Sequence, residues 1–179
     1  MKKLMTLLLA GLTLISVCGC GSSGKPDEPD DPPVADETLV VINDLEFHLN
    51  KETSFSGLCY TAVEDFKEVQ HDEHIPYVQY SYAQQDGSNL LFFRVFYYKN
   101  RDVAYALKDL GIEGNVELTD GNNGSLDYQL YAQPRDDGGT IHFYFITRDK
   151  DTYALNFISK YDIRAFEEKT VSSVHFAAE

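Results

Sequence analysis

Basic residues are scarce in this sequence: 15 Lys and Arg stand against 29 Asp and Glu, which gives a formal net charge of −14 at pH 7. A surface of this charge repels the phosphates of nucleic acids and of anionic lipids, so we expect no nucleic-acid binding. It also argues against a domain that lies flat on a bilayer. Solubility is the simplest interpretation of the charge. Tryptophan is absent, although the chain has 12 Tyr and 11 Phe.

The motifs of common catalytic and cofactor sites are also missing. The sequence contains no Gly-x-Ser-x-Gly nucleophile elbow and no glycine-rich phosphate loop. Residues 120–127 fail the calcium-loop pattern, because Gly124 and Ser125 occupy the positions that require an oxygen ligand and a glycine. We therefore expect a protein without catalytic activity and without a cofactor.

A long apolar run occurs once, near the start of the chain. Lys2 and Lys3 precede an uncharged segment, residues 4–17, which is about 14 residues long, whereas a transmembrane helix needs about 20. A short basic region followed by an apolar core of this length predicts a secretory signal.

The residues Val17-Cys18-Gly19-Cys20 resemble the lipobox of bacterial lipoproteins, although Val17 stands where Leu is commoner and Cys18 is unusual. The resemblance implies a signal peptide over residues 1–19 and a diacylglyceryl group on Cys20, the new N-terminus. Two acyl chains give stable anchoring. We therefore expect a protein anchored on the extracytoplasmic face of the cell membrane, with a Gram-positive surface slightly favoured. An ordinary cleaved signal without lipid is the alternative.

The rest of the chain divides into a tether and one domain. Residues 20–37 are rich in Pro, Asp, Gly and Ser, and we expect a disordered acidic tether. Residues 38–179 have the size of a single domain, which we expect to be monomeric. With Cys18 in the signal and Cys20 lipidated, Cys59 has no partner for a disulfide within the chain. A free cysteine is most often a small buried apolar residue, as we expect here.

Alternating apolar residues and turn residues predict strands through most of the domain. The strand at 90–98 is apolar on both faces except at Arg94, as in a central strand. We expect a hairpin at 39–49, strands at 58–62, 77–82, 116–119 and 126–132, a turn at 120–124, and a second hairpin at 141–159.

Helical spacing predicts two helices. Asn100 and Gly111 are the expected ends of the first, and Asp162 is the expected cap of the second. In the second helix Ile163, Phe166, Thr170 and Val174 share one face, and a short strand follows at Phe176. The order strands, helix, strands, helix, strand predicts an α+β fold: a mainly antiparallel sheet with two amphipathic helices packed on it.

The last third of the chain is similar to the Mog1/PsbP-like α/β/α sandwich, a group that includes bacterial lipoproteins. The similarity lies in residues 141–145, 153–157, 162–169 and 174–176. Members of that fold are mainly known as accessory or binding proteins, so the resemblance implies such a role. It transfers no functional residue, because the matching positions are packing positions.

Two polar groups of residues invite a chemical interpretation. His71 and His74 can bind a divalent metal, but Pro76 interrupts any helix and no third ligand is visible, so we favour a solvated loop. Cys59 with a distant His offers an alternative function, an extracytoplasmic hydrolase or thiol enzyme. Metal binding through His71 and His74 is a further alternative.

The abundant tyrosines give the only candidate binding surface. Exposed Tyr rings on adjacent strands make a surface for a ligand or partner, although packing beneath the helices is the simpler interpretation. The sequence thus predicts a lipid-anchored binding or accessory protein of the bacterial envelope, whose partner is an envelope protein or a small ligand. The residues of this surface would be Tyr77, Tyr80, Tyr82, Tyr97 and Tyr98.

Overall fold

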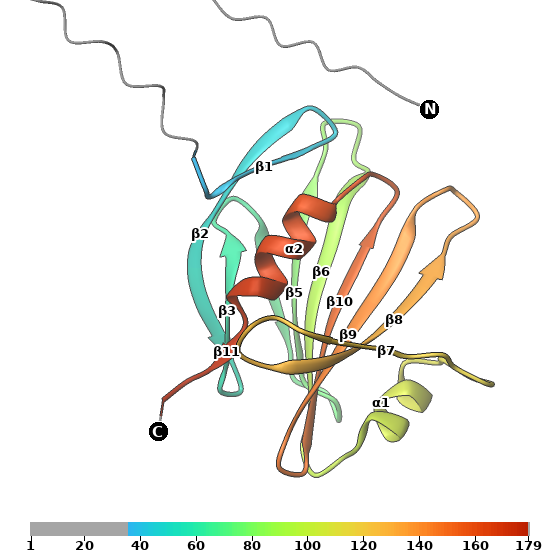
Figure 1. Ribbon diagram of the computed structural model, residues 1–179. Coiled ribbons are helices and arrows are strands. Elements are labelled where there is room, and N and C mark those ends of the chain that lie inside the picture. Colours follow the sequence, from blue (N-terminus) through green and yellow to red (C-terminus); the bar gives the residue numbers. More distant parts are fainter. Residues whose placement is uncertain (1–35, 179) are drawn as a thin grey trace, which may run out of the picture. The chain divides into compact units, whose positions relative to one another are not determined.

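Two antiparallel sheets form most of the structure, a computed structural model that describes residues 36–178 (Figure 1). The smaller sheet has the strand order β1-β2-β3-β11, and the larger has the order β4-β5-β6-β10-β9-β8-β7. The smaller sheet contains β1 (Leu39–Ile42), β2 (Leu45–Phe55), β3 (Leu58–Val63) and β11 (His175–Phe176). The larger sheet contains β4 (Lys67–His71), β5 (Tyr77–Ala83), β6 (Asn89–Tyr98), β7 (Thr119–Asn122), β8 (Asp127–Pro134), β9 (Thr140–Arg148) and β10 (Asp151–Ser159).

Two helices complete the architecture, α1 (Val103–Asp109) and α2 (Arg164–Ser173). The expected α+β class, a mainly antiparallel sheet with two helices, is confirmed. Both predicted hairpins, β1–β2 and β9–β10, are present in antiparallel register. The division of the strands into two sheets was not predicted, because alternation shows which side chains turn inward but not which strands become neighbours.

Burial of aromatic side chains between the two sheets forms the main core. Phe93 of β6 is fully buried, and its ring centroid lies 4.9 Å from that of Phe157 of β10 and 6.0 Å from that of Phe166 of α2. From the smaller sheet, Tyr60 approaches the same ring at 5.6 Å. The helix α2 therefore packs into this core, and Figure 1 shows it lying across the strands between β3 and β10.

The opposite face of the larger sheet carries a second, smaller cluster. Phe96, Tyr98, Phe143, Phe145 and Ala154 form it together with Ala106 of α1. The two helices thus cover different faces of the larger sheet. The predicted apolar face of α2 is confirmed, since Ile163, Phe166, Thr170 and Val174 are all buried.

The N-cap of the first helix lies two residues later than predicted. Asp102 is the N-cap and accepts a hydrogen bond from the backbone N–H of Tyr105 at 2.9 Å. Asn100 instead has a left-handed backbone with φ 53° and donates its N–H to Asp151 at 2.7 Å. Gly111 is confirmed in the left-handed position after the helix, with φ 71°.

Two other boundaries differ from the prediction, and one strand is additional. Ile163 rather than Asp162 is the N-cap of α2, although the carboxylate of Asp162 accepts the backbone N–H of Arg164 at 3.1 Å. The strand expected at 116–119 is β7, shifted into the expected turn, because the side chain of Asn123 accepts the N–H groups of Ser125 and Leu126 and closes a tighter turn. Strand β4 was not predicted, since its side chains are mostly polar.

The predicted signal peptide, the lipidated Cys20 and the tether up to residue 35 lie outside the described residues. The described residues 36–178 belong to one compact unit. No helix within residues 36–178 is long and apolar enough to cross a membrane.

Candidate functional site

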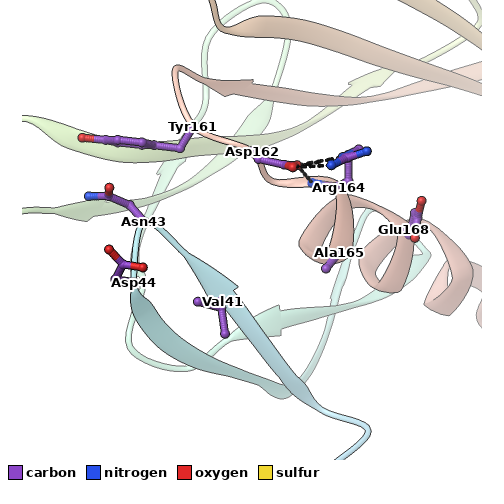
Figure 2. Close-up of a pocket in the computed structure, with 8 residues that line it drawn as sticks. All are labelled: Val41, Asn43, Asp44, Tyr161, Asp162, Arg164, Ala165 and Glu168. Carbon is purple, nitrogen blue, oxygen red and sulfur yellow. Dashed lines mark hydrogen bonds and ion pairs between the residues drawn. The ribbon is translucent and has the colours of Figure 1, made fainter.

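An open pocket of about 650 Å³ lies between the β1–β2 turn and the start of α2 (Figure 2). The turn has two central residues, Asn43 and Asp44, both in the left-handed region at φ 51° and φ 61°. Asn and Asp are the residues that tolerate this conformation in a two-residue hairpin. Their side chains therefore lie at the rim of the pocket. The pocket is lined by Val41, Asn43, Asp44, Tyr161, Asp162, Arg164, Ala165 and Glu168.

Hydrogen bonds between distant parts of the chain hold one side of this rim. The amide of Asn43 donates to the side-chain oxygen of Gln84 at 3.1 Å. The amide nitrogen of Gln84 lies 3.1 Å from the hydroxyl of Tyr161. The β1–β2 turn and the segment before α2 are thus tied through one glutamine.

The pocket carries an excess of negative charge. Arg164 forms an ion pair with Asp162: its Nη2 lies 2.5 Å from Oδ2, and its Nε lies 3.0 Å from Oδ1. This ion pair lowers the pKa of Asp162 to about 2. Among residues 36–178, Asp44 and Glu168 form no ion pair. Val41, which is 52% exposed, adds an apolar contact beside these carboxylates. The lining therefore suits a group that combines a positive charge or a hydrogen-bond donor with an apolar stem.

A smaller adjoining pocket of about 300 Å³ shares Tyr161, Asp162 and Arg164 with the first, and His142 and Glu167 also line it. The strand β9 turns His142 and Tyr144 toward α2. Both meet Glu167, whose Oε1 accepts the hydroxyl of Tyr144 at 2.6 Å and lies 2.6 Å from Nδ1 of His142.

Burial isolates this carboxylate. Glu167 is 4% exposed, so the two hydrogen bonds replace contacts that its carboxylate would otherwise make with water. Burial raises the pKa of Tyr144, and the bond to Glu167 raises it further, so the hydroxyl remains a donor. We name His142, Tyr144 and Glu167 the buried triad after its two buried members, Tyr144 and Glu167, whereas His142 is partly exposed.

The buried triad resembles part of a hydrolytic site without completing it. A carboxylate that orients an imidazole serves catalysis when the other ring nitrogen activates a nucleophile. Within the described chain, the ring of His142 makes no hydrogen bond to a Ser, Thr or Cys side chain. These three residues were not predicted from the sequence. The detectable signal was a carboxylate at position 167, next to Phe166 on the apolar face of a helix.

The five candidate tyrosines do not form one exposed surface. Tyr80 and Tyr98 are buried, at 1% and 0% exposure, on opposite faces of the larger sheet. Tyr82 and Tyr97 lie on the same face as Tyr80, partly buried against the main core. Tyr77 faces the other way. The alternation of β5 and β6 explains the division, because residues an odd number apart point to opposite faces.

The two candidate metal ligands, His71 and His74, have different surroundings. His71 ends strand β4, where its ring stacks on Tyr77 with centroids 4.3 Å apart, so the loop prediction is wrong for this residue. His74 lies in the following loop, with Nε2 3.8 Å from a carboxylate oxygen of Asp109. No group of three or more His, Cys, Asp or Glu within residues 36–178 is placed to hold a metal ion.

Cys59 is partly exposed, and the expectation that it is buried is wrong. Leu58 and Tyr60 occupy the inward positions of β3, so alternation turns Cys59 outward. In the register it lies opposite His175 of β11, and the two side chains share a face. Nδ1 of His175 lies 2.9 Å from the carbonyl of Ser173, and no hydrogen bond within the described residues joins the imidazole to the thiol.

Comparisons with known proteins give little further information. No family model matches the chain, and no curated protein does. A solved structure from Bacteroides thetaiotaomicron VPI-5482 is similar over 69% of this chain at 12% sequence identity, with a TM-score of 0.46. The aligned part spans 46% of that protein's chain.

Proposed function

We propose that this protein is a lipid-anchored binding or accessory protein of the bacterial envelope. A diacylglyceryl group on Cys20 would hold the chain outside the cytoplasm, and residues 20–37 would separate the domain from the bilayer. The lipobox-like residues 17–20 support the anchor. The observation that carries the binding role is the open pocket at the start of α2.

The chemistry of this pocket suits a protruding basic side chain of an envelope protein. Small-molecule sites are mostly apolar and enclosed. This pocket is open and joins the exposed Val41 with the carboxylates of Asp44 and Glu168, which have no ion-pair partner among residues 36–178. A Lys or Arg side chain provides an apolar stem that can contact Val41 and a positive charge that can pair with Asp44 and Glu168.

The proposal extends to the fold and to the absence of catalysis. The larger, antiparallel sheet has a helix on each face, which supports a Mog1/PsbP-like relationship. The smaller sheet lies on the same side as α2 and is additional to this arrangement of one sheet between two helices. The incomplete buried triad and the separated Cys59 and His175 support a non-enzymatic role over a hydrolase or thiol enzyme.

Photocrosslinking in intact cells tests the binding role. With a photoreactive amino acid in place of Val41, we expect a reproducible crosslinked protein, which weakens when Asp44→Asn and Glu168→Gln are added. The matched control is Lys150, an exposed residue in the turn at the opposite end of β10, about 30 Å along the strand. Equal crosslinking from positions 41 and 150, or none at position 41, would contradict the proposal.

Replacement of the anchoring residue tests the location. In cells fed labelled palmitate, we expect the parent protein to carry the label and to sediment with membranes. Cys20→Ala removes the only thiol that the lipobox can modify, so label and sedimentation should both disappear, while Cys59→Ala should change neither. A Cys20→Ala protein that fractionates like the parent would refute the anchor.

A further inference from the structure

Arg94 lies in the middle of the larger sheet, on the face that points away from the smaller sheet. Its neighbours across the strands are Gln79 of β5 and Asn156 of β10. On either side of it along β6, Phe93 and Val95 point into the main core. A cation is therefore the outward-facing residue at the centre of a strand that is otherwise apolar.

Only part of this face is covered. The second cluster, around α1, packs on the end of the face that contains Phe96 and Tyr98. Toward the other end, Phe92, Ile158 and Ile141 form a row in register across β6, β10 and β9, and all three are partly exposed. We call the open face the surface formed by Gln79, Phe92, Arg94, Ile141 and Ile158, whereas Asn156, on the same side of the sheet, is buried.

The charge of Arg94 has no counter-ion within residues 36–178. Its Nε donates to Oε1 of Gln79 at 2.8 Å, and its Cζ lies 5.3 Å from the ring centroid of Phe92. Arg94 is half-buried, and this burial lowers the pKa of its guanidinium. A partly desolvated cation without a counter-ion is unusual in a chain with a net charge of −14.

The neighbouring Asn156 has a side-chain acceptor without a hydrogen bond. Asn156 is 1% exposed, and its Nδ2 donates to the carbonyl of His142 at 3.1 Å. Its Oδ1 is buried and has no hydrogen-bond donor in the described part of the chain. A buried acceptor without a donor costs about 1–3 kcal/mol. Because this oxygen has no accessible surface, it adds to the polar surroundings of Arg94 but is not a contact for another molecule. The unpaired cation beside partly exposed apolar side chains is the feature that indicates a partner.

We infer that the open face binds an acidic segment of a partner protein, with one carboxylate on the guanidinium of Arg94 and apolar side chains on Phe92, Ile141 and Ile158. Gln79 holds Nε, so the guanidinium plane is fixed while both Nη groups have no hydrogen bond within residues 36–178. Two such nitrogens match the two oxygens of a carboxylate.

The form of the surface favours a protein over a small molecule. Small ligands occupy concave sites, whereas the face of a sheet accommodates an extended segment or loop. Arg beside aromatic residues is also the composition found at the energetic centres of protein interfaces. The net negative charge of this chain repels an acidic partner. Binding of such a partner therefore depends on the local positive charge of Arg94.

A peptide titration followed by NMR tests the inference. The protein is residues 20–179 with Cys20→Ser, and the probe is the peptide acetyl-Leu-Glu-Phe-Asp-Leu-amide. Its control is the same peptide with Gln and Asn in place of Glu and Asp. We expect saturable shifts in β6 and β10 with the acidic peptide, and at least about a tenfold higher Kd both with the neutral peptide and in Arg94→Gln.

Two further variants keep the result independent of folding. Arg94→Gln should unfold at the same temperature as the parent or a higher one, because it removes a partly buried cation that has no counter-ion within residues 36–178. Ile158→Glu should abolish peptide binding by repulsion while Arg94 stays in place, and Arg94→Lys should retain part of the affinity.

Several results would overturn the inference. They are an equal Kd for the two peptides, an Arg94→Gln protein that binds normally, no saturable binding, or shifts confined to the pocket beside Val41. Binding that appears only after deletion of residues 21–37 would also overturn it, by assigning the open face to the chain's own acidic segment. Crosslinking at Val41 concerns the opposite side of the larger sheet, so the two proposals can fail separately.

Discussion

Replacement of Phe93 by alanine is expected to lower the free energy of unfolding by about 3–5 kcal/mol, the usual effect of removing a large aromatic ring from a packed core. Phe93 has no exposed surface and contacts rings from both sheets and from α2. A domain of this size is stable by about 5–15 kcal/mol, so the variant loses a large part of its stability. Urea unfolding followed by circular dichroism measures the change.

The adjacent phenylalanine provides the control. Phe92 has the same side chain and the same strand, but it lies on the open face and is partly exposed. Phe92→Ala should therefore lose less than half as much stability as Phe93→Ala. Equal losses would mean that the two faces of β6 have been assigned incorrectly.

Replacement of Glu167 by alanine is expected to lower the free energy of unfolding by about 2–4 kcal/mol, because a buried hydroxyl and an imidazole lose their acceptor. Glu168→Ala is the matched control, since Glu168 is the next residue and is exposed, and a change within about 0.5 kcal/mol is expected there. Chemical denaturation of both variants under the same conditions gives the comparison.

A double-mutant cycle separates the hydrogen bond from simple loss of volume. Tyr144→Phe removes the hydroxyl that Glu167 accepts, so part of the loss should be shared between the two single variants. Additive losses in the double variant, or a Glu167→Ala protein as stable as Glu168→Ala, would show that the buried triad is not an interacting unit.

Local patterns in the sequence were sufficient for many elements but not for their arrangement. The spacing of Ile163, Phe166, Thr170 and Val174 identified the buried face of α2, and the alternation in β9 and β10 identified a hairpin. The same patterns contain no information on pairing between strands that lie far apart in the chain. The pairing of β11 with β3 and the position of β10 between β6 and β9 are of this kind.

The candidate sites were less predictable for the same reason. The pocket beside Val41 joins a turn near residue 43 to a helix that begins at Arg164, and the buried triad joins β9 to that helix. Arg94 did stand out in the sequence as the one charge in an apolar strand. Its lack of a counter-ion is visible only when its neighbours are known.

The late position of β10 in the chain has a consequence for biogenesis. Strand β10 joins β4-β5-β6 to β9-β8-β7, and β11, at the end of the described chain, completes the smaller sheet. If the chain is exported as proposed above, a chain that enters a translocation channel from its N-terminus could not close either sheet until nearly all of it had emerged. Such long-range pairing folds slowly, which would keep a precursor unfolded and competent for translocation.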